Sequence, residues 1–280
     1  MKTPYWLLLF VSGLAWSMDE GDYLVDAKTE GVASLSVLWV ASSGWAEAGA
    51  GGHPQGFTID LMREFAAWLE STQGLKVELQ FEQEQDWRVF YERVRMGSGG
   101  VFGLGNVTIT EPRRLELSFS PPYVRNVAVL ITHVDRAEIL QPEQMRQALA
   151  GLRAMAFAGT LHERRLQTLK DSVWPEMPMD FSGSNQAILD AVAADTHFAY
   201  IDGYNYLQAR DRGAPLRRHP ALDDAGESFG IIMPLDNDWQ ALLAEFFAGG
   251  GGLSMQSWYR DSLKRHLGAA IADLMAVGPE

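Results

Sequence analysis

The segment 108–114 reads Thr-Ile-Thr-Glu-Pro-Arg-Arg and places two hydroxyls and an arginine where an apolar run ends. A threonine ahead of a proline-containing turn is a typical helix N-cap, so we expect Thr110 to cap a short helix with Pro112 in its first turn. Arg113 would then project beside the hydroxyl of Thr108. Because a planar guanidinium can pair with a carboxylate through two parallel hydrogen bonds, this pattern indicates a pocket for a small carboxylate.

An alternative assigns Arg113 a surface role, in which it forms a salt bridge with Glu111, Glu116 or another acid. The residues of this segment alone leave the two interpretations open. Asp202 stands at the end of an apolar run, where its side chain could cap the turn that follows.

The elements around this segment alternate in type. We expect strands at residues 34–41, 77–81 and 101–109, separated by an amphipathic helix that opens at Gly56 and a helix at 87–96. Strands that alternate with helices predict a parallel α/β sheet, and ligands gather outside the carboxyl ends of such strands. The predicted carboxylate pocket lies at that edge.

A second α/β unit follows the β-branched run at 127–132. We expect a strand at 152–158, a helix whose start is marked by Thr160 and Glu163 at capping-box spacing, and a strand at 198–201. The amides of that helix start could receive an anion, although capping alone also explains the pair. This unit predicts a second lobe.

The expected organisation is discontinuous. Residues 18–132 and 228–280 would form lobe 1, and residues 133–227 would form lobe 2, with the first hinge crossing near His133. The acidic segment 19–31 lacks a clear apolar period and is expected to be loosely ordered, and 258–275 is expected to be one helix.

Composition excludes several classes of protein. The chain has 280 residues, 47% of them hydrophobic, no cysteine and a net charge of −13. The absence of cysteine removes disulfides, thiol catalysis and cysteine-based metal sites. The negative charge argues against nucleic acid or an anionic membrane surface as a partner. The six histidines show no ligand spacing with acids, so we expect no metal and no cofactor.

The N-terminus has the pattern of a secretory signal peptide. Lys2 precedes an apolar run, and small residues stand ahead of the acidic pair at 19–20, so we expect residues 1–17 to be removed after Ser17. The run is shorter than the ~20 residues that a membrane-spanning helix needs. Loss of Lys2 takes the net charge from −13 to −14, and the mature chain is expected to be a free periplasmic monomer.

The segment 108–113, together with Phe-Ser-Pro-Pro-Tyr at 119–123, resembles the signature of the family 3 extracellular solute-binding proteins. These are the amino-acid receptors of ABC importers, and their usual form is Ile-Thr-Pro-Glu-Arg followed by Phe-Ser-x-Pro-Tyr. Here Pro and Glu are exchanged and the arginine stays in register. Gly-Phe-x-x-Asp-Leu at 56–61 also resembles the family. The resemblance implies a two-lobed periplasmic binding protein-like fold of type II, with a mainly parallel sheet in each lobe.

The resemblance also implies roles for individual residues. Arg113 would hold the α-carboxylate of a ligand, helped by Thr108 and by the backbone around Asn106. Thr160 would contact the same carboxylate from the other lobe, and Asp202 would accept the ammonium group. A dry cleft cannot leave an ammonium group unpaired without a cost of several kcal/mol, so a zwitterion needs an acid there.

Two tryptophans are candidates for the side-chain pocket of the ligand. Trp87 is similar to the aromatic residue that lines this pocket in the family, and Trp45 would cover its opposite face. Both could instead be core residues. No aspartate stands near residues 40–43, where the family often has one, which argues against a cationic ligand side chain.

The implied function is capture of an amino acid or related small carboxylate by closure of two lobes, for delivery to an ABC permease, without turnover. A rival is a periplasmic enzyme similar to cyclohexadienyl dehydratase, for which Asp202 and Glu163 are candidate acids. A third alternative is a ligand-sensing accessory protein.

Overall fold

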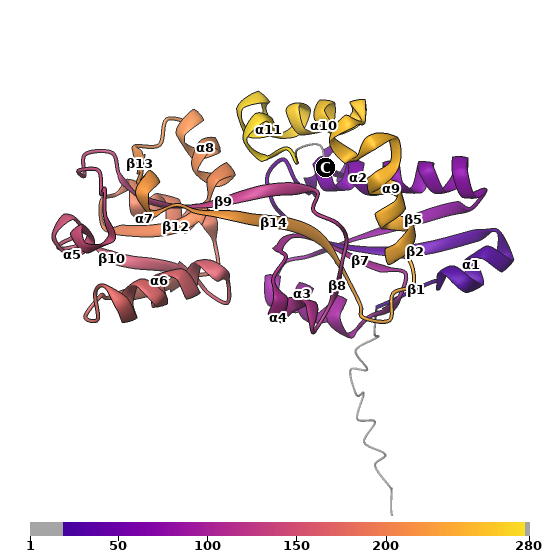
Figure 1. Cartoon of the computed structure of the whole chain (residues 1–280), viewed down its shortest axis with the longest axis horizontal. Coiled ribbons are helices and arrows are strands. Elements are labelled where there is room, and N and C mark those ends of the chain that lie inside the picture. The colour runs from indigo at the N-terminus through magenta and orange to yellow at the C-terminus, as the bar shows by residue number, and fades with distance from the viewer. Residues whose placement is uncertain (1–18, 278–280) are drawn as a thin grey trace, which may run out of the picture.

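The computed structural model describes residues 19–277, so the signal peptide expected at residues 1–17 lies outside the described part. Two α/β lobes lie side by side and are joined by two long strands, β9 (Val124–His133) and β14 (Asp224–Met233). Figure 1 shows both strands running from one lobe into the other. The arrangement confirms the predicted two-lobed α/β fold.

The sheet of lobe 1 is built on three parallel strands. The central strand β2 (Val32–Val40) pairs with β5 (Lys76–Glu84) on one side and with β7 (Val101–Thr108) on the other, and β14 pairs antiparallel with β7. The second half of β2 is buried on both faces: Val37 packs on one side of the sheet, and Leu38 packs on the other. Residues 37–40 are apolar as such a position requires, whereas Ser34 and Ser36 in the first half are only half-buried.

Helices cover both faces of this sheet. On one face lie α2 (Phe57–Trp68), α9 (Gln240–Ala248), α10 (Ser257–Leu267) and α11 (Ala269–Met275), whereas α3 (Trp87–Met96) covers the other. The expected single helix at 258–275 is therefore wrong, because Gly268 separates two helices with φ +87°.

The segment 19–31 is ordered, contrary to expectation. It forms the short strand β1 (Glu20–Gly21) and the helix α1 (Leu24–Glu30). Asp238 accepts hydrogen bonds from the first backbone amides of α1, at 2.8 Å from Leu24 N. Because the capping residue Asp238 is remote in sequence, no local pattern predicts the helix.

Lobe 2 repeats the plan of lobe 1. The strands β10 (Arg153–Phe157), β11 (Met179–Ser182) and β12 (His197–Asp202) run parallel, and β9 pairs antiparallel with β12. The helix α6 (Leu161–Ser172) packs on one face, and α7 (Asn185–Ala193) and α8 (Gly203–Asp211) pack on the other. The shorter elements of the two lobes are α4 (Glu111–Arg114), α5 (Met145–Ala148), β3 (Glu47–Ala48), β4 (Pro54–Gln55), β6 (Ser98–Gly99), β8 (Ser118–Phe119) and β13 (Leu216–Arg218).

The crossing between lobes takes place inside β9. Val124 belongs to the core of lobe 1 and Ala128 to that of lobe 2, so the chain enters lobe 2 earlier than the crossing expected near His133. On β14 the return lies between Asp224, which pairs with Ala128, and Phe229, which packs in the core of lobe 1. Asn126 and Glu227 are register partners at this crossing.

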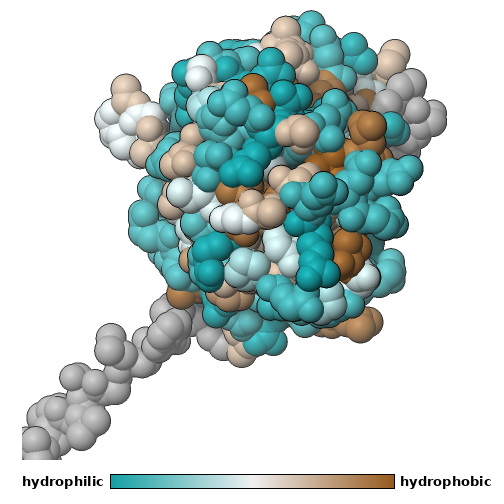
Figure 2. Space-filling model, turned by 90° about the vertical axis from the view of Figure 1, so that its left-hand side faces the viewer, coloured by the Kyte–Doolittle hydropathy of each residue, from teal (hydrophilic) through white to brown (hydrophobic). Residues whose placement is uncertain are grey.

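The outer surface of lobe 2 is largely hydrophilic. Figure 2 shows this end of the molecule with its apolar side chains in scattered spots rather than in one broad patch. Among the helices of residues 19–277, none combines the length and the apolar character required to cross a lipid bilayer.

Candidate ligand-binding cleft

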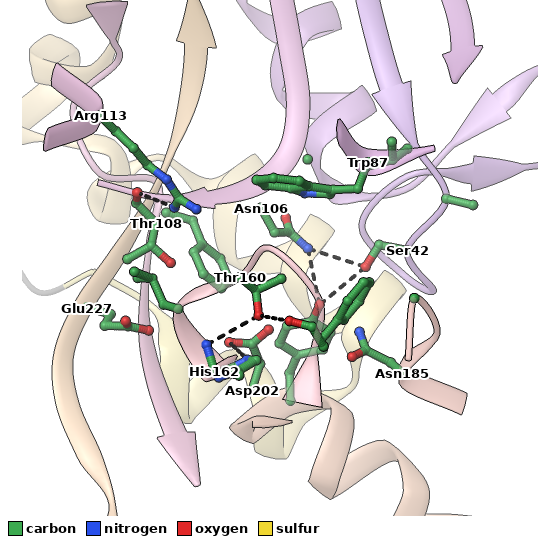
Figure 3. A pocket seen from close by; sticks show the side chains of 18 of the residues that line it. Ser42, Trp87, Asn106, Thr108, Arg113, Thr160, His162, Asn185, Asp202 and Glu227 are labelled. Carbon is green, nitrogen blue, oxygen red and sulfur yellow. Dashed lines mark hydrogen bonds and ion pairs between the residues drawn. The ribbon is translucent and has the colours of Figure 1, made fainter. Parts of the chain in front are cut away.

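A cavity of about 210 Å³ lies between the two lobes. Figure 3 shows side chains from both lobes pointing into it. From lobe 1 it is lined by Ser42, Trp87, Asn106, Thr108 and Arg113. From lobe 2 and strand β14 it is lined by Thr160, His162, Asn185, Asp202 and Glu227. The cavity lies at the carboxyl ends of β2, β7 and β12, where ligands of parallel α/β sheets gather.

The helix α4 sets the position of Arg113. Thr110 caps this helix as expected, and its hydroxyl accepts a hydrogen bond from the backbone N–H of Arg113 at 3.4 Å. The guanidinium Nη1 donates to the backbone carbonyl oxygen of Thr108 at 3.0 Å. This contact differs in detail from the expected placement beside the Thr108 hydroxyl, but it holds the guanidinium at the cavity.

Arg113 forms no salt bridge with any carboxylate of residues 19–277. The two acids considered as partners are engaged elsewhere: Glu111 lies 3.9 Å from Arg114, and Glu116 accepts a hydrogen bond from Tyr91 at 3.0 Å. The surface-pairing alternative for Arg113 is therefore not the arrangement found.

Two aromatic rings flank the guanidinium. The Cζ atom of Arg113 lies 5.7 Å from the ring centre of Trp87 and 5.9 Å from that of Tyr91, within cation–π range. Burial lowers the pKa of Arg113 from its ordinary value, while the nearby Tyr91 and Glu227 act in the opposite direction. Arginine keeps its charge in proteins, so the cleft holds a cation that has lost much of its hydration.

Asn106 anchors the lobe 1 side of the cavity. Its backbone adopts φ +50°, a left-handed conformation that asparagine accepts more readily than most residues. Its Nδ2 lies 3.3 Å from Ser42 Oγ and 3.4 Å from Tyr204 Oη, and its Oδ1 accepts from Tyr123 at 2.9 Å. The side chain is therefore fixed by three neighbours.

Thr160 caps α6 on the opposite side of the cleft. Its hydroxyl accepts from the backbone N–H of His162 at 3.2 Å and donates to the carbonyl oxygen of Phe157 at 2.8 Å. Glu163 does not reach Thr160 but accepts from the backbone N–H of Gly159 at 2.7 Å. Both side chains stabilise the turn that directs the N-terminus of α6, with its partial positive charge, toward the cavity.

Asp202 lies at the end of β12 and lines the cavity from below in Figure 3. Its Oδ1 accepts a hydrogen bond from Asn126 Nδ2 at 2.6 Å, and His162 Nε2 lies 3.4 Å away. Burial alone would raise the pKa of Asp202, but His162 and Asn126 outweigh it, and the net shift is downward. The carboxylate is therefore ionised at neutral pH.

Glu227 and Arg165 form an ion pair beside Asp202. Arg165 also binds Asp224 at 2.7 Å, so this second arginine of the cleft is neutralised. Among the described residues that line the cavity, Arg113 is thus the arginine left without an acidic partner.

Trp45 does not line the cavity. It is 1% exposed and packs in the core of lobe 1 against Phe57, Tyr123, Tyr204 and Phe229. The expectation that it covers a face of the ligand is therefore corrected, because no part of its ring reaches the cleft. Trp87, by contrast, is half-buried and lines the cavity.

The sequence profile of the bacterial extracellular solute-binding proteins, family 3, matches residues 45–276. The chain belongs to this family. Family membership and the geometry of the cleft together make it a ligand-binding protein. A search of the curated proteins gave no match.

Three solved structures that share the fold of this family 3 protein are amino-acid-binding or substrate-binding proteins. An ancestral arginine-binding protein with bound arginine has a TM-score of 0.66 at 17% identity, over 84% of this chain and 98% of that one. A substrate-binding protein of an ABC uptake transporter from Streptococcus pneumoniae, with bound histidine, has a TM-score of 0.66 at 16% identity, over 88% and 96%. The ancestral amino-acid-binding protein AncCDT-1, a precursor of cyclohexadienyl dehydratase, has 0.64 at 17%, over 87% and 98%.

Several lining residues of this family 3 protein were not predicted. Ser42 follows β2 and could have been found from the rule that ligands gather at carboxyl strand ends. His162 and Arg165 lie within the first turns of α6, whose start was predicted. Tyr204 lies two residues beyond the end of β12, so the same rule could have found it. Glu227 reaches the cleft only because of the way the lobes meet, so no local signal marks it.

Among residues 19–277, no group of three or more His, Asp and Glu side chains is arranged to hold a metal ion.

Proposed function

We propose that the protein captures an amino acid or a related small carboxylate in the cleft and presents it to an ABC-type importer in the periplasm. The observation that carries the proposal is Arg113, an arginine that faces the cavity with no carboxylate partner among the described residues. A desolvated cation without a partner is unfavourable, and a ligand carboxylate would supply that partner.

The opposite wall suits the other end of a zwitterion. Asp202 is ionised, and its Oδ2 accepts no hydrogen bond from the rest of the described chain. In this proposal Oδ2 accepts the ligand ammonium group, while Thr160 and the N-terminus of α6 approach the carboxylate from lobe 2. Thr108 and the backbone near Asn106 assist Arg113, and Trp87 forms an aromatic wall for the side chain of the ligand.

Because Arg113 and Asp202 belong to different lobes, a ligand held by both would link the lobes. The strands β9 and β14 are the connections that would bend. Ligand contacts made only in the closed state would shift the population toward closure, and the closed form is the species a permease would recognise.

Binding without turnover is favoured over catalysis by the electrostatics of Asp202. A carboxylic acid that donates a proton near neutral pH needs a raised pKa, whereas the pKa of Asp202 is lowered. The other candidate acid, Glu163, lies outside the cavity lining and accepts from Gly159. A dehydratase would need a different acid.

A thermal-shift screen tests the proposal. The mature protein is heated with each L-amino acid, with opines and small carboxylates, and with prephenate. A ligand at one hundred times its Kd adds about 2.7 kcal/mol, which raises the melting temperature of a chain this size by about 5 °C or more. We expect one zwitterion to give this shift in the wild type.

The matched variants are Arg113→Ala and Arg114→Ala. Removal of one partner of a buried charge pair costs about 2–5 kcal/mol, so Arg113→Ala should lose the shift, whereas the exposed Arg114→Ala should keep it. A shift that survives in Arg113→Ala would rule out the assigned site. Disappearance of the compound during incubation would favour the enzyme.

Export and assembly are measured separately. We expect the intact mass of the periplasmic product to begin at residue 18 and its elution volume to be that of a monomer. A full-length mass, or retention in the cytoplasm, would contradict removal of residues 1–17.

A further inference from the structure

Five side chains form a closed polar ring where the two lobes meet. Asn126 Nδ2 donates to Asp202 Oδ1 at 2.6 Å and to Glu227 Oε2 at 3.0 Å. Arg165 pairs with Glu227 and lies 3.3 Å, through Nη1, from His162 Nδ1. His162 Nε2 lies 3.4 Å from Asp202 Oδ1, which closes the ring. The ring joins β9, β14, β12 and α6.

The direction of every proton in this ring follows from its donors. A guanidinium can only donate, so His162 Nδ1 must accept from Arg165, and the proton of a neutral imidazole is then on Nε2, toward Asp202. Both N–H groups of Asn126 face carboxylates, which fixes the orientation of its amide. Asp202 Oδ1 is therefore occupied twice, and Oδ2 is left for the cleft.

This orientation leaves one buried polar atom of Asn126 without a hydrogen bond. The side chain is 1% exposed, and its Oδ1 finds no hydrogen-bond donor in residues 19–277. A buried acceptor without a partner is unfavourable. Without the amide, however, the carboxylates of Asp202 and Glu227 would share this buried region with no donor between them, which is less favourable still.

The location of Asn126 connects this contact to the hinge. Asn126 and Glu227 are register partners on β9 and β14, at the point where these strands cross between the lobes. Asp202 is thus hydrogen-bonded through Asn126 to the crossing strand β9, in addition to its place at the end of β12. A change in the crossing would displace Asp202 relative to Arg113.

We propose that Asn126 is a positioning residue for the ligand ammonium group. It holds the Asp202 carboxylate to strand β9, so that one carboxylate oxygen stays directed to the cleft. The inference rests on the proposed function, in which Asp202 accepts that group. It predicts that Asn126 controls discrimination between an amino acid and the same compound without its amino group. A purely structural role would not select between these two ligands.

Titration calorimetry with paired ligands tests this role. Each amino acid found in the thermal screen is paired with its desamino analogue, as L-glutamine is with glutaramate. We expect Asn126→Ala to reduce the ratio of the two Kd values at least tenfold, with the Kd of the desamino analogue changed less than threefold. Asn126→Ser, which keeps a short donor, is the second variant in case the alanine variant does not fold.

Arg125→Ala is the matched control, since Arg125 is exposed on the same strand. It should leave the ratio unchanged. Equal weakening of both ligands in Asn126→Ala, or an unchanged ratio, would overturn the role of Asn126. If the wild type binds no amino acid, or if binding survives in Arg113→Ala, the proposed function itself fails. If binding depends on Arg113 but the ratio does not depend on Asn126, only the present inference fails.

Discussion

Arg113 and Asp202 face one cavity from different lobes, and neither forms a salt bridge with a permanently charged partner within residues 19–277. Each is oriented by hydrogen bonds to groups other than Lys, Arg, Asp or Glu side chains. Arg113 donates to a backbone carbonyl, and Asp202 accepts from the amide of Asn126 and lies 3.4 Å from the imidazole of His162. Two opposite charges held apart in this way suit a ligand that carries both.

Arg113→Lys separates the effect of charge from that of geometry. Lysine keeps the positive charge but loses the planar fork that binds a carboxylate through two hydrogen bonds. We expect the Kd of the ligand to rise about tenfold, or about 1.4 kcal/mol, as measured by calorimetry. Arg114→Lys, at an exposed residue 3.9 Å from Glu111, should stay within about twofold. Equal affinities for both variants would argue against a bidentate contact.

Trp45 and Trp87 should respond to alanine in opposite ways. Trp45 is buried among four aromatic rings, so Trp45→Ala should lower the free energy of unfolding by about 3–5 kcal/mol. Trp87→Ala should cost only about 1 kcal/mol of stability but weaken ligand binding about tenfold, since its ring lines the cleft. Urea unfolding and calorimetry measure the two effects. A large stability loss in Trp87→Ala with unchanged affinity would refute this assignment.

His219 should make the protein sensitive to mild acid. The ring is fully buried, and the backbone N–H of Ile139 donates to its Nδ1 at 3.0 Å, so the imidazole is neutral in the fold. Burial lowers the pKa of His219 from 6.5 to about 4. The unfolded chain therefore binds this proton at higher pH than the folded one, and stability falls as the pH drops from about 6.5 to about 4.

The expected loss from this one group is about 2–3 kcal/mol between pH 7 and pH 4.5. Urea unfolding of the wild type and of His219→Gln at both pH values measures it. The glutamine variant is expected to start less stable at pH 7 and to lose less on acidification. Identical pH dependence in the two proteins would show that His219 is not the sensor.

The sequence predicted the elements that carry local signals. Helix α3 begins at Trp87 and ends at Met96 as expected, because Asp86 caps its start and the amphipathic period is regular. The Thr110 cap and the cleft positions of Arg113, Thr160 and Asp202 also followed from strand ends and helix starts.

Features that depend on distant contacts were not predictable in the same way. Helix α1 begins where Asp238 accepts from its first amides, more than two hundred residues later in the chain. The sequence around Trp45 does not distinguish a tryptophan that packs in the core from one that lines a binding site. Asn126, Glu227 and Arg165 meet only where the two lobes join, so their polar ring has no counterpart in any short segment.

Gly268 is a local signal for a break in the helix expected at 258–275. It lies between α10 and α11 with φ +87° and ψ 160°, a region that is essentially restricted to glycine. A side chain there would strain the backbone, so Gly268→Ala should lower the free energy of unfolding by about 1–3 kcal/mol. Gly249→Ala is the matched control, because its φ of −58° is accessible to alanine and nothing lies within 4 Å of an added Cβ. Urea unfolding of both variants measures the difference. If Gly268→Ala were as stable as Gly249→Ala, α10 and α11 could merge into the single helix that the apolar pattern of 258–275 suggests.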